Sequence, residues 1–321
     1  MYHILVPDNL DQAGLKLLEA AEGVTVQAAA KMSREEVLAA IPKADALIIR
    51  SATKVDRAML EAAPKLKLVG RAGVGVDNVD LVAATDRGVV VMNAPDGNTV
   101  ATAELAIGLM LALARHIPAA DGSLKSGQWE RKAYMGIELR GKTLGLIGFG
   151  RVGRAVAKRA AAFEMTIIAF DPYISAEVAA PYGVQMVTLD ELYARADFIS
   201  LHALVTQENY HMINAESLAK MKDGVRIVND SRGALIDEVA LAEAIKRGKV
   251  AGAALDVYEE EPPKPDNPLI GLAGVIHTPH LGASTLEAQD EVAVQIAQQT
   301  LDALFKGDYR NVVNVDVLKG K

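Results

Sequence analysis

One stretch, residues 142–171, constrains the fold of this chain more than any other. It begins with a short apolar run, Thr143–Ile147, which is typical of a buried strand. A helical pattern comes next, and a second β-rich run, Thr166–Phe170, follows it. Between the first strand and the helix lie three glycines in the order G-x-G-x-x-G, namely Gly148, Gly150 and Gly153. This order of elements predicts a βαβ unit with a glycine-rich turn.

The glycine-rich turn is suited to the pyrophosphate of a dinucleotide. Gly148 lets the chain turn tightly, Gly150 lets a phosphate approach the backbone because it has no Cβ, and Gly153 lets helix and strand pack closely. The phosphate charge would face free N–H groups at the helix N-terminus. A chance glycine-rich turn is the alternative, but such a turn lacks the strand, helix and strand that flank this one.

Asp171 stands at the end of the second strand, 18 residues after Gly153. A carboxylate at this point can accept hydrogen bonds from an adenosine ribose, and it would repel a 2′-phosphate. We therefore predict NAD, and not NADP, as the cofactor.

Composition narrows the classes of protein and of partner. A length of 321 residues suggests about two domains. The net charge of −7, without a long basic run, does not favour nucleic acid as a partner. The chain has no cysteine, which excludes disulfides and thiolate metal sites; we predict no metal and a cytoplasmic location. The N-terminus has no signal-peptide pattern, and the most apolar segment, 100–113, is too short to cross a membrane.

Strand and helix patterns alternate along the chain on both sides of a polar, irregular segment, Ala120–Arg140. The alternation predicts an α/β protein with two doubly wound parallel-sheet domains. The irregular segment contains the single tryptophan, Trp129, and is interpreted as a linker or as an arm that reaches a partner subunit. The expected strands before it are Ile4–Val6, Val24–Val26, Ala46–Ile49, Leu66–Val69 and Val89–Met92.

Three polar clusters follow strands of the second unit: residues 229–233, 255–263 and 278–285. Because the carboxyl ends of parallel strands share one edge of a sheet, Arg232, one acid of Glu259–Glu261, and His280 can converge there. A protonated histidine can donate a proton to a carbonyl that receives hydride, and a neutral histidine can take it back. A neighbouring carboxylate raises the pKa of such a histidine, and an arginine can hold a 2-oxo acid carboxylate.

Other interpretations of these clusters remain open on the residues alone. A histidine at a strand end can be structural, three consecutive glutamates can be a solvated run, and Asp256 can be a turn acid. Arg50 and Arg71 also stand at expected strand ends, with Gly73 and Gly75 beside Arg71. They are either anion-binding residues or solvated surface arginines.

The chain resembles the D-2-hydroxyacid dehydrogenase family over nearly its whole length. The stretches that carry the resemblance are Arg50-Ser-Ala-Thr-Lys, the run 69–80 with Gly-Arg-Ala-Gly, Trp129-Glu-Arg-Lys, the glycine turn 148–153, Ala254-Leu-Asp-Val-Tyr and Thr278-Pro-His-Leu-Gly-Ala-Ser-Thr. The resemblance implies a Rossmann NAD-binding domain, residues 99–286, inserted in a flavodoxin-like substrate domain of residues 1–98 plus 287–321. It also implies a substrate held between the domains, hinge closure, and a homodimer or homotetramer.

The same resemblance implies roles for individual residues. His280 would be the acid–base residue, Glu261 its partner, and Arg232 the anchor of the substrate carboxylate. Substrate would also meet Arg50, Arg71, Gly75 and, across a dimer interface, Arg131. The implied cofactor contacts are Gly148, Gly150, Arg151, Val152 and Gly153 at the pyrophosphate, Asp171 at the ribose, and Val74, Ala203, Asp230, Asp256, Gly282 and Ala283 on the nicotinamide side.

The Arg50 and Gly70–Gly73 runs resemble the branch of the family that oxidises 3-phospho-D-glycerate to 3-phosphooxypyruvate, the first step of L-serine biosynthesis. The substrate would then be a phosphorylated 2-hydroxy or 2-oxo acid. A reductase of hydroxypyruvate, glyoxylate or 2-oxoglutarate is the alternative within the family. An NAD-sensing binding protein, similar to the corepressors on this scaffold, is the alternative from another class.

Three features depart from the family pattern. Leu204 stands where the family usually has proline, and Asp230 stands where it usually has a small or uncharged residue. The chain ends at Lys321, before the serine-binding regulatory domains that many members of this branch carry. Feedback inhibition through such domains is therefore not expected.

Overall fold

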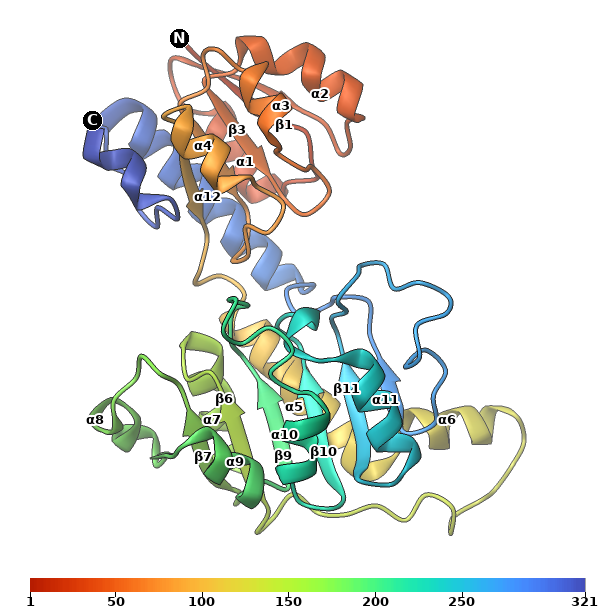
Figure 1. The fold of residues 1–321 in the computed structure, drawn as a ribbon. Coiled ribbons are helices and arrows are strands. Elements are labelled where there is room, and N and C mark those ends of the chain that lie inside the picture. Colours follow the sequence, from red (N-terminus) through yellow and green to blue (C-terminus); the bar gives the residue numbers. More distant parts are fainter. Residues whose placement is uncertain (321) are drawn as a thin grey trace. The chain divides into compact units, whose positions relative to one another are not determined.

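The computed structural model describes residues 1–320 and separates into two compact units. The first unit comprises Met1–Asn98 and Ala283–Lys321, and the second comprises Thr99–Gly282. Figure 1 follows both units along the chain. The sequence predicts the second boundary after residue 286, whereas the structure has it after Gly282.

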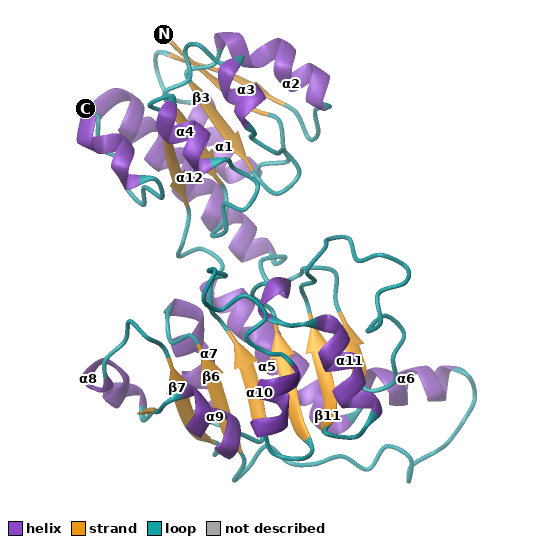
Figure 2. Cartoon of the chain, viewed as in Figure 1, coloured by secondary structure: helices purple, strands orange, loops and turns teal. Residues whose placement is uncertain are grey.

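The first unit contains a five-stranded parallel sheet with the strand order β2-β1-β3-β4-β5. This is the order of flavodoxin-like folds. Helices cover both faces of the sheet (Figure 2). The elements are β1 (Tyr2–Val6), α1 (Gln12–Glu19), β2 (Val24–Ala28), α2 (Arg34–Ala40), β3 (Ala46–Ile49), α3 (Arg57–Glu61), β4 (Leu68–Arg71), α4 (Leu81–Asp86), β5 (Val90–Asn93) and the late helix α12 (Leu286–Lys306), with short 3-10 turns at Ile41–Lys43 and Val315–Gly320.

Two hydrophobic clusters build the core of the first unit, one on each face of its sheet. Alternate strand residues point to opposite faces, so Ile4 and Ile48 lie in one cluster and Leu5 and Leu47 in the other. The first cluster is closed by α12, a helix from the far end of the chain. Helix α2 begins with a capping box, in which Ser33 and Glu36 exchange side-chain and backbone hydrogen bonds.

The second unit contains a seven-stranded parallel sheet with the order β12-β11-β10-β9-β6-β7-β8. The order reverses between β6 and β9, which makes that point the switch of a doubly wound nucleotide-binding sheet. The elements are α5 (Thr99–Arg115), α6 (Ile117–Lys125), β6 (Thr143–Ile147), α7 (Arg151–Ala161), β7 (Thr166–Phe170), α8 (Ala176–Ala179), β8 (Gln185–Met186), α9 (Leu189–Arg195), β9 (Phe198–Leu201), α10 (Ala215–Lys220), β10 (Val225–Asn229), α11 (Glu238–Lys246), β11 (Val250–Leu255) and β12 (Val275–His277), with 3-10 turns at Ala180–Tyr182 and Gly233–Leu235.

The two faces of this sheet are covered by different helices. One hydrophobic cluster joins α5 and α7 to strand residues such as Leu144 and Leu146, and the other joins α9, α10 and α11 to residues such as Ile199 and Ile227. Both faces are buried, which explains why the strands read as short continuous apolar runs.

The prediction that residues 120–140 are irregular is wrong for its first part, because α6 runs from Ile117 to Lys125. None of its residues is buried. An exposed helix has no apolar stripe, so its period does not stand out in the sequence. In Figure 1, α6 and the loop behind it extend from one edge of the second unit.

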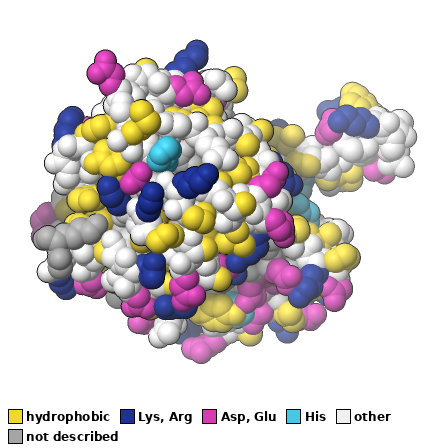
Figure 3. Space-filling model, turned by 90° about the horizontal axis from the view of Figure 1, so that it is seen from above, with side chains coloured by type: hydrophobic (Ala, Val, Ile, Leu, Met, Phe, Trp, Pro, Cys, Tyr) yellow, Lys and Arg dark blue, Asp and Glu magenta, His cyan; other side chains and the backbone are white. Residues whose placement is uncertain are grey.

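Within the part of the chain that the structure describes, no single helix is long and apolar enough to cross a membrane. Only α5 and α6 taken together meet such a measure, and they are bent by 62° relative to each other. Much of α5 is buried in the core of the second unit. On the surface seen in Figure 3, acidic and basic side chains are interspersed among apolar ones.

Candidate active site

The glycine-rich turn between β6 and α7 has the shape that a dinucleotide needs. Gly148 adopts a φ of +94°, and a Cβ there would lie 2.6 Å from the backbone carbonyl of His202. A Cβ at Gly150 would meet no atom within 4 Å, so open space faces the backbone at this point. Gly150 is also the N-cap of α7, and no side chain caps the helix. The turn therefore fits a pyrophosphate at the positive end of α7.

The third glycine serves the packing of the helix. Gly153 is buried, and a Cβ there would lie 2.3 Å from the carbonyl oxygen of Gly148. Any side chain at this position would push α7 away from the turn. Arg151 and Val152 form the first turn of α7, where Arg151 is exposed and Val152 is partly buried.

Asp171 follows β7 and braces the glycine turn. One carboxylate oxygen accepts a hydrogen bond from the N–H of Phe149 at 2.8 Å, and the other accepts one from the N–H of Tyr173 at 2.9 Å. Asp171 is only partly buried. Sequence spacing indicates a ribose contact for this residue, but it gives no sign of the bond to Phe149, which depends on how closely β6 and β7 lie together.

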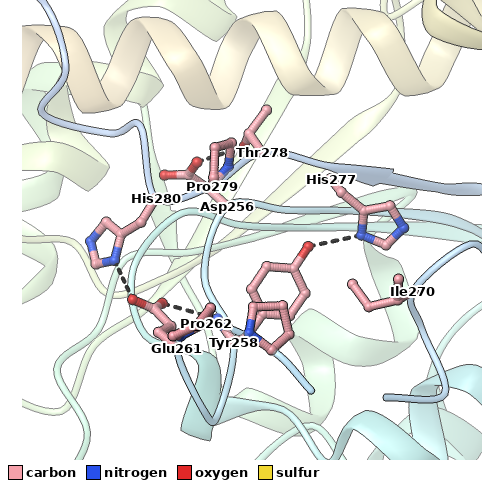
Figure 4. A pocket seen from close by; sticks show the side chains of 10 residues that line it. Asp256, Tyr258, Glu261, Pro262, Ile270, His277, Thr278, Pro279 and His280 are labelled. Carbon is pink, nitrogen blue, oxygen red and sulfur yellow. Dashed lines mark hydrogen bonds and ion pairs between the residues drawn. The ribbon is translucent and has the colours of Figure 1, made fainter. Parts of the chain in front are cut away.

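His280 and Glu261 form the most direct polar pair at the carboxyl edge of the sheet. Their Nδ1 and Oε2 atoms are 2.6 Å apart (Figure 4). The other carboxylate oxygen of Glu261 accepts the N–H of Tyr258 at 3.1 Å. His280 has a φ of +54°, a conformation that non-glycine residues seldom adopt. Its side chain is 53% exposed, so the imidazole can meet a ligand while Glu261 holds one ring nitrogen.

The two partners shift each other's proton affinity. The hydrogen bond that His280 donates to Glu261 raises the pKa of His280 above its usual range, against the opposing effect of burial and of the Arg232 charge. Burial would raise the pKa of Glu261, but the hydrogen bond and charge of His280 outweigh it and lower that pKa. The pair thus stabilises an imidazolium next to a carboxylate.

The structure places Arg232 near this pair. Its positive charge contributes to the lowered pKa of Glu261. One guanidinium nitrogen donates to the carbonyl of Ser231 at 2.7 Å. Behind it, Gly233 packs so closely on the next loop that a Cβ would lie 1.8 Å from the backbone of Tyr258. This close packing brings the loop after β10 beside the loop that carries Glu261.

Only one of the three consecutive glutamates is free to serve His280. The hydroxyl of Tyr210 donates to Glu259, whose other oxygen lies 3.2 Å from His211 Nε2. Glu260 forms an ion pair with Lys264 at 2.6 Å. The acid directly before Pro262 is therefore the one that the fold turns toward the histidine.

Asp256 organises the turn that carries His280. Its buried carboxylate accepts hydrogen bonds from the hydroxyl of Thr278 at 2.6 Å, from Leu281 N–H at 2.7 Å and from Gly282 N–H at 2.9 Å. Burial raises the pKa of Asp256, and these hydrogen bonds oppose that rise. The turn-acid interpretation is therefore the one that the contacts support, and a direct cofactor contact remains a prediction.

A cavity of about 460 Å³ opens beside the pair. Tyr258 and His277 both line it, and the tyrosine hydroxyl lies 2.8 Å from His277 Nδ1 (Figure 4). Burial raises the pKa of Tyr258 to about 12 and lowers the pKa of His277. Sequence reasoning misses this second pair, because neither residue forms a motif with the other. The remaining lining is largely apolar and comprises Pro262, Pro263, Ile270 and Pro279 next to Asp256, Glu261, Thr278 and His280.

In the first unit, the structure places Arg50 and Arg71 at the carboxyl ends of the neighbouring strands β3 and β4. The backbone N–H of Arg50 donates to the buried carboxylate of Asp8 at 2.6 Å. Arg71 lies over Gly73, where a Cβ would come within 1.5 Å of the guanidinium. Gly73 is thus required for the position of the Arg71 side chain.

The other predicted site residues are distributed over both units. Val74, Gly75 and Ala283 belong to the first unit, and the carbonyl of Val74 accepts a hydrogen bond from Asn93 at 2.6 Å. Arg131 lies on the exposed loop after α6 in the second unit. Among the described residues, no hydrogen bond or ion pair joins Arg131 to His280 or Glu261. Ala203 directly follows His202, the first residue after β9. The backbone carbonyl of Gly282 accepts a hydrogen bond from the Thr102 hydroxyl at 3.0 Å.

The nucleotide-binding unit has a direct match among known families. Residues 107–282, more than half of the chain, match the model described as D-isomer specific 2-hydroxyacid dehydrogenase, NAD binding domain. The chain belongs to this family. This match confirms the NAD-binding domain that is predicted from the glycine turn and Asp171.

Relatives that are named as dehydrogenases are similar in sequence to this chain over nearly its whole length. It is 52% identical over 312 residues to D-3-phosphoglycerate dehydrogenase of Archaeoglobus fulgidus, a match that covers 97% of this chain and 59% of the relative. It is 54% identical over 316 residues to the protein of the same name from Methanocaldococcus jannaschii, covering 98% and 60%. The chain thus spans about three fifths of the length of these relatives.

Solved structures of other dehydrogenases share the fold. A glyoxylate reductase from Paecilomyes thermophila has a TM-score of 0.88 at 33% identity, covering 97% of this chain and 98% of that one. D-lactate dehydrogenase from Escherichia coli has a TM-score of 0.83 at 33% identity, covering 98% and 100%. Enzymes named for different substrates therefore share one architecture, and the choice of substrate must depend on side chains.

Proposed function

We propose that the chain interconverts 3-phospho-D-glycerate and 3-phosphooxypyruvate with NAD, the first step of L-serine biosynthesis. The observation that carries the proposal is the 2.6 Å contact between His280 Nδ1 and Glu261 Oε2 at the carboxyl edge of a nucleotide-binding sheet. The choice of substrate is supported by the names of the relatives that are 52% and 54% identical. Since the chain has no cysteine, we place this activity in the reducing cytoplasm.

His280 is proposed to move the proton. In the reductive direction its imidazolium donates a proton to the carbonyl oxygen of the 2-oxo acid as that oxygen gains negative charge. In the oxidative direction the neutral ring takes the proton from the 2-hydroxyl group. Glu261 holds Nδ1, so the other ring nitrogen, Nε2, is the one that exchanges the proton with substrate.

The dinucleotide, when bound, accepts or donates the hydride. Gly148, Gly150 and Gly153, with Arg151 and Val152, are proposed to hold its pyrophosphate at the N-terminus of α7. Asp171 is proposed to bind the adenosine ribose. The proposed nicotinamide side is formed by the residues after the later strands, Ala203, Asp230, Asp256 and Gly282, together with Ala283 and Val74 of the first unit.

Arginines are proposed to bind the substrate. Arg232 would hold the carboxylate through two parallel hydrogen bonds, the geometry in which a guanidinium fits a carboxylate. Arg50 and Arg71, with the backbone at Gly75, are proposed to bind the rest of the phosphorylated acid. Arg131 is proposed to reach the phosphate group of substrate bound to a second copy of the chain, in a homodimer or homotetramer.

One assay tests the proposal. NADH oxidation by the purified chain is measured with 3-phosphooxypyruvate, hydroxypyruvate, glyoxylate and 2-oxoglutarate as separate substrates. We expect the highest kcat/KM with 3-phosphooxypyruvate. Equal or higher values with the unphosphorylated acids would replace this assignment by a reductase of those acids. Cofactor binding without turnover of any of the four would favour an NAD-sensing binding protein.

A further inference from the structure

Asp230 is a buried acid that directly follows β10. The residue is 5% exposed and its side chain is fully enclosed, yet neither carboxylate oxygen accepts a hydrogen bond from any described residue. Asp256 on the neighbouring loop, in contrast, accepts three. An enclosed carboxylate without donors costs free energy in the folded protein, and such groups persist mainly where they serve a site.

His202 lies beside Asp230. Its Nδ1 lies 3.4 Å from Asp230 Oδ1, and its own side chain is only 1% exposed. The other ring nitrogen, Nε2, lies 2.9 Å from the Ser200 hydroxyl. Ser200 is also fully buried, so this row of three side chains has no opening for a substrate. A role in nucleophilic catalysis is therefore excluded for it, and a role through charge remains.

The place of the two residues in the sheet connects them to the cofactor. Asp230 follows β10 and His202 follows β9, the first strand beyond the reversal of strand order. The backbone of His202 packs directly against Gly148 of the phosphate turn. The glycine turn and Asp171 occupy the half of the sheet formed by β6, β7 and β8, which is the adenosine half of a dinucleotide site. Asp230 consequently belongs to the other half, which faces the nicotinamide.

The two redox forms of the cofactor differ at the nicotinamide alone. The oxidised ring carries a positive charge and the reduced ring is neutral, whereas adenosine and pyrophosphate are the same in both. A buried negative charge on the nicotinamide half therefore interacts differently with the two forms, and it does so strongly because little water screens it.

We propose that Asp230 is a charge-selecting residue of the cofactor site, which raises the affinity for the oxidised cofactor relative to the reduced one. This inference rests on the proposed function, since it requires that the unit binds NAD. It also requires that the enclosed carboxylate is ionised and that His202, at 3.4 Å, does not compensate its charge. The positively charged ring then compensates the enclosed carboxylate that the free protein leaves without a donor.

The test compares the binding of NAD⁺ and NADH by the full chain without substrate. The dissociation constants of both forms are measured by titration calorimetry for the wild-type protein, for Asp230→Asn and for Asp171→Asn. Asparagine keeps the shape of aspartate and removes its charge. Asp171, on the adenosine half, is the matched control, because that half of the cofactor does not change with oxidation.

For Asp230→Asn we expect the preference for NAD⁺ over NADH to fall about tenfold, on the order of the interaction of unit charges within one site at an effective dielectric constant of about 20. This fall corresponds to about 30 mV in the midpoint potential of the bound two-electron couple. For Asp171→Asn we expect both affinities to fall by the same factor. An unchanged ratio in Asp230→Asn, or an equal change in both affinities, would overturn the inference.

Thermal unfolding and a second variant accompany the binding data. Asp230→Asn and Asp230→Ala both remove the enclosed acid; Asp230→Asn, which keeps the shape of the side chain, is expected to unfold at or above the wild-type temperature. The wild-type titration separates the two proposals. If the wild-type protein bound neither form, the proposed function itself would fail. If it bound both forms with a ratio that neither Asp230 variant alters, only the charge-selecting role would fail.

Discussion

The backbone N–H of His280 donates to the backbone carbonyl of Asp256 at 2.8 Å, while the Asp256 carboxylate holds the N–H groups of the two residues after His280. The residue that directly follows β11 thus positions the turn that follows β12. Asp256 acts on the proposed reaction through His280. A substitution of Asp256 should therefore disturb the position of His280 more than it weakens the binding of substrate.

Asp256→Ala is expected to lower kcat by a larger factor than it changes KM, because the turn that orients His280 loses its acceptors. The loss of partners for buried N–H groups should also destabilise the fold by about 1–3 kcal/mol. Steady-state kinetics and chemical denaturation check both effects. Thr188→Ala is the matched control, since it removes an N-cap of α9 and should cost about 1 kcal/mol of stability without a change in kcat.

His280→Asn should lower turnover by about 10²–10⁴-fold, the usual contribution of a positioned acid–base group. NADH binding should stay close to that of the wild-type protein, because the glycine turn is unaltered. Stopped-flow turnover and NADH fluorescence titration measure the two quantities. A turnover rate near the wild-type value would remove His280 from its proposed role.

Glu261→Gln should move the pH profile of the reductive reaction. The hydrogen bond to Glu261 raises the pKa of His280, so its loss lowers that pKa and leaves less imidazolium at neutral pH. The decrease of kcat/KM on the alkaline side should therefore begin at a lower pH in the variant. A profile that does not move would show that Glu261 does not tune the proton donor.

The same pair predicts a pH window for stability. The raised pKa of His280 gives a contribution that is complete below the unfolded value of 6.5 and is lost as the pH rises through the folded pKa. The lowered pKa of Glu261 gives one that is complete above the unfolded value of 4.5 and is lost as the pH falls through the folded pKa. The difference in unfolding temperature between wild type and Glu261→Gln should thus be largest between pH 4.5 and 6.5.

Substitution by alanine at two glycines of one motif should affect two different properties, cofactor binding at Gly150 and stability at Gly153. Gly150→Ala should fold normally but bind NADH more weakly, because its Cβ enters the open space in front of the turn. Gly153→Ala should destabilise the fold by about 1–3 kcal/mol, because its Cβ would meet the carbonyl oxygen of Gly148 at 2.3 Å. Gly108→Ala on α5, where a Cβ meets nothing within 4 Å, is the control, and it is expected to raise the free energy of unfolding by about 0.5–1 kcal/mol.

Asp171→Ala should weaken NAD binding and reduce the discrimination against NADP. Two effects act together, since the substitution removes the proposed ribose acceptor and also the acceptor of Phe149 N–H. Dissociation constants for NADH and NADPH test the prediction. An unchanged ratio between them would mean that Asp171 braces the turn without binding the ribose.

Elements with a strong local signal could be predicted closely from the sequence. The strands Ala46–Ile49, Thr143–Ile147 and Thr166–Phe170 have the bounds expected for them, because short apolar runs between turn residues mark buried parallel strands. The helix α6 could not, because exposed helices lack an apolar stripe.

The candidate site could also be predicted only in part. Strand ends predicted that Arg232, an acid of the run 259–261 and His280 converge, since parallel strands share an edge. The sequence alone could not choose among the three acids; that choice depends on Tyr210, His211 and Lys264, which pair with the other two. The pairs Tyr258–His277 and His202–Asp230 were likewise out of reach, because each joins residues from two different loops or strands.

Because the chain returns to its first unit after completing the second, the two units are completed at different times during synthesis. The first sheet needs α12 to close one face. Asn314 accepts a hydrogen bond from the N–H of Val91 on β5 and donates one to the carbonyl of Val89, directly before that strand. These residues leave the ribosome more than 180 residues after the strands that they complete. The continuous unit Thr99–Gly282 has all of its strands by then. The nucleotide-binding unit is thus able to fold while the unit that begins the chain still waits for its last helix.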